Sequence, residues 1–455
     1  MAFCTYAHGT AAAITRFATE MEGAHSMKDC RSKEGLWALG VLIFLLVAFP
    51  ATAGAGGLFL TEIGTADVGL AGAGWAARAQ DPATLFRNPA GMSLLEGNQF
   101  LAGAQLLYAD MKFSSQGSSG FLGTGNGGNP VDVFPGGSAF YTHSLGRDFK
   151  LGIGVFSNFG LGLKYTGEWI GRYYAKESTL VGASIMPAAS YRVNEWLSIG
   201  AALNVMVAQL KYVTAINQIG SDGSLRLQDV TAGVGGNVGI MLEPKKGTRL
   251  GVTYYSQVDL DFGSTPSFDN LGAGTNAILT AAGLKGNEID LGMTVPQHVV
   301  VSVFHQFTDR LALMADFGWE DWSRFGKVDV SVDESGTSLT TDIPFQDTYH
   351  VGGGGQFRLN PQWLINAGVG YDSAMLKDGD RTVGLPVGST YKFGVGAEWR
   401  PKETYTVGFN YEFAWSGDMT VNQQAALPGP IASRGNVVGT FKDANIHFFN
   451  VNVKW

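Results

Sequence analysis

The stretch Phe449-Asn-Val-Asn-Val-Lys-Trp455, at the end of the chain, decides how the fold is interpreted. Successive side chains of a β-strand point to opposite faces. In an extended conformation, Phe449, Val451, Val453 and Trp455 therefore share one face, and the polar residues between them share the other. One face suits lipid and the other suits water, as in a strand of a transmembrane barrel.

The same pattern recurs along most of the chain. From Gln99 onward, 14 stretches rich in Val, Ile, Phe, Tyr and Trp alternate with period two and are separated by turn-forming residues. The predicted strands are 99–113, 137–145, 150–159, 178–193, 196–213, 225–243, 248–262, 294–307, 310–333, 345–358, 362–374, 389–400, 403–416 and 443–455. An even number of strands lets the first pair with the last, which removes exposed sheet edges.

The connections between these strands alternate in length. Short turns such as Gly146-Arg-Asp-Phe149 alternate with long segments such as 114–136, 263–293 and 417–442. Short turns at one rim and long loops at the other are typical of bacterial outer-membrane barrels, whose short turns are periplasmic. The sequence therefore predicts an all-β transmembrane barrel of 14 antiparallel strands over residues 99–455.

The N-terminal 53 residues resemble an export signal. Basic residues precede the apolar stretch 36–49, and Ala51-Thr52-Ala53 supplies small residues at the −3 and −1 positions of a cleavage site. The apolar stretch has 14 residues, fewer than the roughly 20 of a spanning helix, so an N-terminal anchor is the weaker alternative. Residues 1–53 are interpreted as an N-terminal extension with a signal peptide, and Met27 as the expected translation start.

Residues 54–98 do not fit a strand pattern. The stretch 68–77 is rich in Gly and Ala, and Asp81-Pro82 and Asn88-Pro89 are turn signals. Eight strands already enclose a barrel that side chains can fill, so 14 strands leave a wider lumen. Residues 54–98 could form a periplasmic tail or a plug, and the wide lumen favours a plug, or hatch, inside the barrel.

Composition excludes several classes of protein. The 31 Lys and Arg residues against 39 Asp and Glu give a net charge of −8, so no broad basic surface is expected and nucleic acid is not a predicted partner. A mean hydropathy of +0.06 is lower than in helical membrane proteins, and no second apolar run long enough for a spanning helix follows residue 49. Cys4 and Cys30 both precede the expected cleavage site, which excludes disulfides and cysteine metal sites from the mature chain.

Signatures of catalysis and cofactor binding are missing from the sequence. It contains no P-loop, no His-Glu-x-x-His, no Cys-x-x-Cys and no Gly-x-Ser-x-Gly motif. The histidines after residue 53 occur singly in strand patterns, at positions 143, 298, 305, 350 and 447. A Ser/His barrel hydrolase is the catalytic alternative, but no serine is paired with a particular histidine. We expect no enzyme activity, no cofactor and no metal.

Several motifs together resemble the FadL-type long-chain fatty acid and hydrocarbon transporters of the outer membrane. They are 57–64 (Gly-Leu-Phe-Leu-Thr-Glu-Ile-Gly), 81–92 with its tripeptide Asn88-Pro89-Ala90, Trp169-Ile-Gly-Arg-Tyr173, Gly251-Val-Thr-Tyr-Tyr-Ser256, Asp321-Trp322-Ser323 and Leu385-Pro386. They occur in the family's order, so the resemblance covers residues 55–455. The final Trp455 also resembles the C-terminal signal that the barrel-assembly machinery recognises.

The resemblance implies passive uptake of hydrophobic molecules, with the hatch blocking the lumen. Asn88, Pro89 and Ala90 would form a hatch turn against the wall near an opening in the third strand. An inward kink there, permitted by glycines, would give a lateral exit into membrane lipid. The glycines expected at the opening are Gly152, Gly154 and Gly160.

The sequence indicates the transport route more clearly than the substrate. A fatty acid carboxylate would need a cation beside an apolar pocket, and the candidates are Arg172, Lys164 and Arg192. An aromatic or alkane hydrocarbon would need no cation. The predicted partners are a hydrophobic small molecule, outer-membrane lipid and the assembly machinery. A structural or adhesive barrel that transports nothing is the rival function, and a uniformly polar open lumen would indicate a general porin.

Overall fold

The structure is a computed structural model that describes residues 58–455 except 219, 282–283, 326, 333–336, 343 and 426–433. The expected signal peptide, its cleavage site and Met27 lie outside the described residues. All described residues belong to the unit Leu46–Trp455. None of the helices in the described part of the chain is long and apolar enough to cross a membrane.

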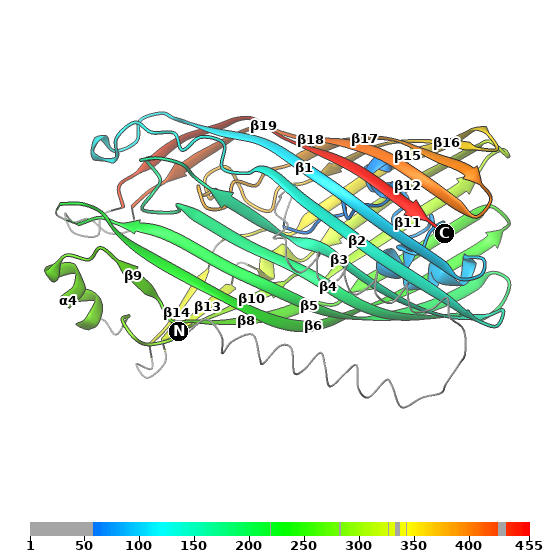
Figure 1. Cartoon of the computed structure of the whole chain (residues 1–455), viewed down its shortest axis with the longest axis horizontal. Coiled ribbons are helices and arrows are strands. Elements are labelled where there is room, and N and C mark those ends of the chain that lie inside the picture. Colours follow the sequence, from blue (N-terminus) through cyan, green and yellow to red (C-terminus); the bar gives the residue numbers. More distant parts are fainter. Residues whose placement is uncertain are drawn as a thin grey trace. The chain divides into compact units, whose positions relative to one another are not determined.

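Fourteen long strands of the described chain form one closed antiparallel sheet (Figure 1). They are β1 (Gln99–Ser115), β2 (Asp132–Leu145), β3 (Phe149–Lys164), β4 (Glu177–Arg192), β5 (Leu197–Ile216), β6 (Gly223–Lys245), β7 (Thr248–Tyr255), β11 (His298–Gln306), β12 (Leu311–Glu320), β15 (Thr348–Asn360), β16 (Trp363–Asp372), β17 (Thr390–Lys402), β18 (Tyr405–Gln423) and β19 (Val437–Lys454). Each pairs with its neighbours in chain order, and β19 pairs with β1 to close the ring. The predicted 14-stranded barrel is therefore confirmed.

The alternation in the last strand has its expected effect. Phe449 and Val451 are 49% and 45% exposed on the outer surface, whereas Asn450 and Asn452 are buried in the lumen. Apolar side chains of the other wall strands, such as Val238 and Phe393, are likewise exposed. The outer surface is thus apolar where a lipid bilayer would contact it.

A second, four-stranded sheet begins where the β6–β7 ladder ends, at Tyr255 and Asn237, about midway along β6. It contains β8 (Val258–Ser264), β10 (Ile289–Val295), β13 (Lys327–Val332) and β14 (Thr337–Asp342). The short strand β9 (Ser267–Asp269) pairs instead with the end of β6, and helix α4 (Ala273–Ala281) follows it. This sheet belongs to the long connections that distinguish one rim from the other (Figure 1).

Three predicted strands are wrong in their extent. The stretch 248–262 is divided at Ser256 and Gln257, and 294–307 is divided at Pro296, because proline lacks the amide hydrogen that a ladder needs. The stretch 310–333 was expected as one strand, but β12 ends at Glu320 and the short helix η4 (Trp322–Arg324) follows. The Ser323 hydroxyl donates to Asp321 at 3.0 Å, a local hydrogen bond that favours a turn over continued pairing.

The hatch lies inside the barrel, as predicted from the lumen's width. Its short helices η1 (Ala66–Leu70), α3 (Thr84–Arg87) and η2 (Pro89–Leu94) pack against the wall, η1 on β16, β17 and β18 and η2 on β4, β5 and β6. Wall glycines let the hatch backbone approach closely. A Cβ atom at Gly103 would lie 1.8 Å from the Gly64 oxygen, and one at Gly251 would lie 2.0 Å from the Ala76 oxygen.

Candidate functional site

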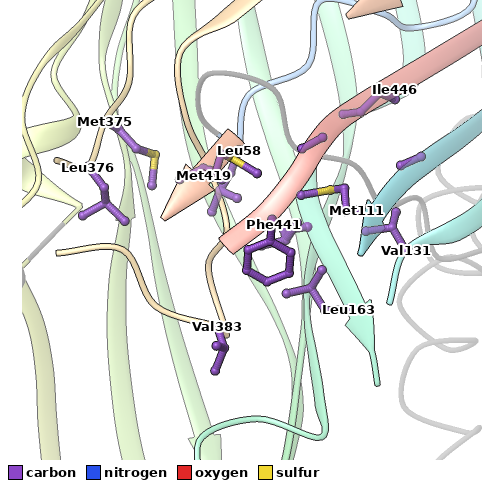
Figure 2. Close-up of a cluster of buried hydrophobic side chains, with 14 of the residues drawn as sticks. Leu58, Met111, Val131, Leu163, Met375, Leu376, Val383, Met419, Phe441 and Ile446 are labelled. Carbon is purple, nitrogen blue, oxygen red and sulfur yellow. The ribbon is translucent and has the colours of Figure 1, made fainter. Parts of the chain in front are cut away.

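Buried apolar side chains fill the lumen between the hatch and the long loops. We call them the apolar lumen cluster, part of which is shown in Figure 2. Its members include Leu58, Met111, Val131, Phe159, Leu161, Leu163, Trp169, Trp322, Phe325, Met375, Leu376, Val383, Met419, Phe441 and Ile446. They come from wall strands, from the hatch and from the loops that cover the lumen. This interior differs from the polar, water-filled lumen of a general porin.

The barrel wall is irregular at β3. Pairing of β2 with β3 ends at Ser138 and Phe156, although β3 continues for eight more residues, to Lys164. The register against β4 shifts between Ser157 and Phe159. Gly160 has a φ of +151°, a conformation that favours glycine because it has no Cβ. The wall therefore lacks a continuous β2–β3 ladder at residues 157–160.

The start of the hatch pairs with β3 where β2 does not. The Leu60 amide donates to the Asn158 oxygen at 2.8 Å, and the Gly160 amide donates to the Leu58 oxygen at 2.7 Å. Gly152 and Gly154 lie lower in β3, in regular register with both β2 and β4. A Cβ atom on Gly152 would lie 2.8 Å from the sulfur of Met92 in the hatch, and one on Gly154 would lie 2.7 Å from the ring of Phe140 on β2. Of the three glycines expected at the opening, only Gly160 lies at the irregularity.

Residues 58–64 separate two cavities, and we call them the partition segment. Phe59 and Thr61 line a central cavity of about 40 Å³, together with residues that include Trp75 and His298. Leu60 and Glu62 line a smaller cavity, whose wall includes Ser157 of β3 and residues 134–137 of β2. The partition segment is thus the part of the hatch that stands between the lumen and the wall irregularity.

A chain of charged side chains holds the partition segment to the opposite wall. Lys392 on β17 forms ion pairs of 2.9 Å with Glu62 of the hatch and with Asp372 on β16. His350 on β15 pairs with Asp372 and, at 2.8 Å, with Asp316 on β12. Burial raises the pKa of Glu62, but the charge of Lys392 and hydrogen bonds lower it more, so its pKa lies below the ordinary value and the carboxylate stays ionised.

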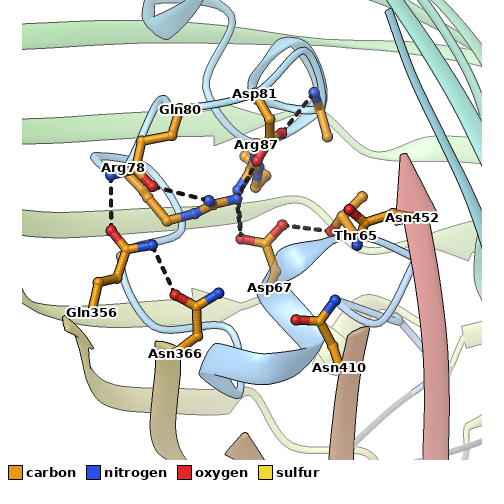
Figure 3. A network of polar contacts seen from close by, with 12 residues as sticks. Thr65, Asp67, Arg78, Gln80, Asp81, Arg87, Gln356, Asn366, Asn410 and Asn452 are labelled. Carbon is orange, nitrogen blue, oxygen red and sulfur yellow. Dashed lines mark hydrogen bonds and ion pairs between the residues drawn. The ribbon is translucent and has the colours of Figure 1, made fainter. Parts of the chain in front are cut away.

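Four charges form the centre of the hatch (Figure 3). Asp67 and Asp81 each pair with both Arg78 and Arg87, and all four side chains are almost fully buried. Burial raises the pKa of Asp81, but Arg87 and Arg78 lower it more, so its pKa is well below the usual range. Sequence reasoning missed this quartet and treated Asp81 only as a turn signal. Opposite charges in a Gly- and Ala-rich segment of a sparsely charged chain were the available signal.

Asn88-Pro89-Ala90 forms a tight turn at the start of η2. The Asn88 side chain accepts a 3.1 Å hydrogen bond from the Ala90 amide and donates to the Ala76 and Ile240 oxygens at 2.8 and 3.0 Å. Ala90 is fully buried, with its backbone against Gly200 of β5. The turn therefore lies against β5 and β6, and its expected position beside the β3 opening is wrong.

The three candidate cations for a carboxylate are not brought together. Arg172 lies in the loop after β3, donates to Asp222 at 2.8 Å and stacks on Tyr173. Lys164 is exposed at the end of β3. Arg192 is at the rim of short turns, where it donates to the hatch oxygen of Ser93 at 2.9 Å.

Two further expectations concern chain closure and metals. The Trp455 amide donates to the Phe100 oxygen at 2.9 Å, so the final residue extends the pairing that closes the barrel. Within the described residues, no group of three or more His, Cys, Asp or Glu side chains could hold a metal ion.

Residues 46–453 match the family described as outer membrane protein transport protein (OMPP1/FadL/TodX). Outer membrane protein P1 of Haemophilus influenzae is 28% identical over 77% of this chain and 85% of its own length. The long-chain fatty acid transport protein of Escherichia coli K12 is 22% identical over 80% of this chain and 91% of its own length.

Solved structures show the same fold. A Pseudomonas aeruginosa FadL homologue superposes with a TM-score of 0.78 at 18% identity, covering 87% of this chain and 99% of its own. The Ralstonia pickettii toluene transporter TbuX gives a TM-score of 0.61 at 20% identity, covering 87% and 98%.

The closed barrel, its internal hatch and its apolar lumen agree with these comparisons. The chain is an outer-membrane β-barrel that transports hydrophobic compounds, and like the transporters of its family it is a channel without enzyme activity. It belongs to the outer membrane protein transport protein family (OMPP1/FadL/TodX).

Proposed function

We propose that this channel takes up long-chain fatty acids without an energy source and releases them sideways into the outer membrane at the β3 irregularity. The observation that carries this proposal is the extent of the apolar lumen cluster. It runs from loop residues such as Trp169 to Leu58 of the partition segment and Phe159 of β3. An apolar environment thus reaches from the loops to the place where the β2–β3 ladder is interrupted.

Lateral release is favourable because the ligand never returns to water. Each buried methylene group is worth about 0.8 kcal/mol, so an acyl chain that crossed an aqueous compartment would lose this at every carbon. For the ligand to pass, the partition segment must leave β3, which would join the central cavity to the cavity beside Ser157. Ligand binding would favour that conformation by a population shift.

Arg172 is the candidate cation whose position best supports a fatty acid. It lies beside Tyr173 and donates to the Leu122 oxygen, and both of these residues belong to the apolar lumen cluster. Its guanidinium already holds Asp222, so an incoming carboxylate would compete with Asp222 for the same donors. Lys164 is exposed at the end of β3, and Arg192 lies at the rim of short turns, where it binds the hatch.

Aromatic or alkane hydrocarbons are the second candidate substrates. Lys392 at the central cavity and Arg172 at the loops are each already in an ion pair. A ligand without charge would require neither pair to break. The toluene transporter TbuX has the same fold over 87% of this chain and 98% of its own length.

A reversible crosslink tests the route. Phe59 and Phe159 face each other in an isolated antiparallel bridge, so Phe59→Cys/Phe159→Cys, with Cys4 and Cys30 changed to Ser, can lock the partition segment to β3. Uptake of labelled oleate and of labelled toluene is measured in cells that lack their own transporter. We expect uptake in the reduced protein and little in the oxidised protein, and the better substrate identifies the ligand class.

The reduced form is the matched control, because it contains the same substitutions. Equal uptake by oxidised and reduced protein would contradict release past β3. Uptake of neither compound by the unaltered chain, in cells where it is folded in the outer membrane, would favour the structural or adhesive alternative.

A further inference from the structure

Lys392 lies among more carboxylates than it binds. Its ammonium group pairs with Glu62 and Asp372, whereas the carboxyl group of Glu412 on β18 is not hydrogen-bonded to it. On the β17–β18 ladder Lys392 lies opposite Ala414, and Glu412 is two residues further along the same lumen face. Such diagonal neighbours are within reach of long side chains.

Glu412 has no donor of its own in the described structure. Its side chain is fully buried, and neither carboxyl oxygen receives a hydrogen bond from a described donor. Lys392, its diagonal neighbour on β17, is already paired with Glu62 and Asp372. A buried carboxylate that receives no hydrogen bond is costly, because burial disfavours the charged form. We therefore assign the charge to Glu62, which Lys392 binds, and the proton to Glu412.

Movement of the partition segment would cost free energy if Lys392 lost Glu62 without gaining another partner. If Glu62 left as a carboxylate, Lys392 would keep only Asp372, which His350 already engages, and His350 also engages Asp316. Glu320, the remaining acid of this cavity, is committed to Trp322 and Thr348. A buried charge that loses its partner is strongly destabilising, and a charged Glu62 would also have to cross an apolar lumen.

We propose that Glu412 is an alternative ion-pair partner for Lys392 and that it replaces Glu62 when the partition segment moves away from β3. The proton on the Glu412 carboxyl group moves to the Glu62 carboxylate, which becomes neutral. The Lys392 ammonium group then pairs with the newly ionised Glu412. No proton enters or leaves the group, one ion pair replaces another, and the neutral Glu62 is free to move with its segment. Glu412 and Lys392 are positioning residues in this step.

This inference rests on the partition-segment motion of the proposed function, but it is tested without substrate. The chain lacks cysteine after residue 30, so Leu60→Cys in a Cys4→Ser/Cys30→Ser background places one thiol on the segment. Leu60 is buried and takes no part in the charged contacts. The rate at which a maleimide labels this thiol in purified, full-length barrel reports how often the segment opens.

Glu412→Gln matches the protonated side chain in shape but can neither give up a proton nor pair with Lys392. We expect it to slow labelling about tenfold or more, since opening then leaves a buried lysine without its second partner. Glu412→Asp should restore part of the rate. Lys392→Met should speed labelling and abolish the effect of Glu412→Gln in the double variant.

The matched control is Glu398→Gln, which removes another lumen carboxylate of β17, bonded to Asn366 rather than to Lys392. It should label at the parent rate, and heat-modifiable gel mobility verifies folding of every variant. Parent-rate labelling in Glu412→Gln, or an equal slowing in Glu398→Gln, would overturn the partner exchange. Because the assay contains no ligand, that result would leave the oleate and toluene measurements to decide the proposed function separately.

Discussion

The charge quartet of the hatch gives the most demanding prediction, for the substitution Asp67→Asn. The Asp67 carboxylate pairs with Arg87 at 2.5 Å and with Arg78 at 3.2 Å. Both guanidinium groups are almost completely buried. The amide keeps the shape of the side chain but removes its charge, so Asp81 is left as the one acidic partner of two arginines within this quartet.

The expected magnitude follows from the burial. Breaking a buried ion pair from one side costs about 3–5 kcal/mol. Since 1.4 kcal/mol is a factor of ten, this shifts the equilibrium between seated and unseated hatch by roughly a hundredfold to a few thousandfold. The barrel should remain folded, because its strands pair with each other around the whole ring.

The assay combines ion conductance with limited proteolysis. Asp67→Asn protein in planar bilayers should open a water-filled pore that the unaltered chain keeps closed, and residues 58–98 should become sensitive to protease while the barrel keeps its heat-modifiable mobility. Ser93→Ala, which removes a neutral hydrogen bond within the same hatch, from the Ser93 hydroxyl to the Ala90 oxygen, is the control and should behave as the unaltered protein.

A double-mutant cycle makes the reasoning refutable. Asp67→Asn/Arg87→Gln removes one charge of each sign, so it should destabilise the hatch by less than the sum of the two single variants. Conductance and protease resistance of Asp67→Asn like those of the unaltered chain, or strict additivity in the cycle, would show that the quartet does not hold the hatch together.

Three more predictions concern the seating of the hatch. Asn88→Ala and Ala90→Leu should reduce oleate uptake while the barrel still assembles. The first variant loses three hydrogen bonds of the turn, and the second places a larger side chain at a fully buried position. Normal uptake per folded protein would show that the turn has no role in transport. Gly251→Val should prevent seating and raise conductance, since even a Cβ atom there would lie 2.0 Å from the Ala76 oxygen; a closed channel would contradict this. The pKa of Asp81 is lowered in the seated hatch, so its ion pairs stabilise the hatch above the unfolded pKa of about 3.9. This stabilisation is lost progressively as the pH falls below that value. Conductance should therefore rise below about pH 4, and a channel that stays closed well below that pH would contradict this.

The sequence was sufficient for the wall because strand alternation is local. Each side chain of β19 takes its face from its immediate neighbours, so the pattern of Phe449 to Trp455 could be interpreted without distant information. The same rule failed at 310–333, where alternation continues beyond Glu320 although the chain turns. Pattern alone does not reveal that β12 ends at Glu320 and that a short helix follows, with Ser323 hydrogen-bonded to Asp321.

The site was harder to predict because its contacts are distant in sequence. Glu62 and Lys392 are 330 residues apart, and Gly74 binds Asp316 across 242 residues. No spacing rule connects such pairs in a single sequence. The third strand could be singled out for its glycines, yet the break lies at residues 157–160, where the hatch replaces β2 as a pairing partner. That exchange depends on tertiary contacts, which a count of glycines does not contain.

The hatch meets the wall by two kinds of contact, and this division explains how a plugged channel can open in one place only. Much of the hatch packs apolar side chains against the wall, as Leu85 and Phe86 do in a buried cluster with Phe156. Apolar contacts lose free energy with every Å² exposed, so this part of the hatch should stay seated. The partition segment adds the ion pair of Glu62 with Lys392 and backbone hydrogen bonds to β3. A typical hydrogen bond contributes only about 1 kcal/mol, because water can replace it. An opening confined to the partition segment therefore breaks contacts that can exchange, while the apolar packing keeps the rest of the hatch in place.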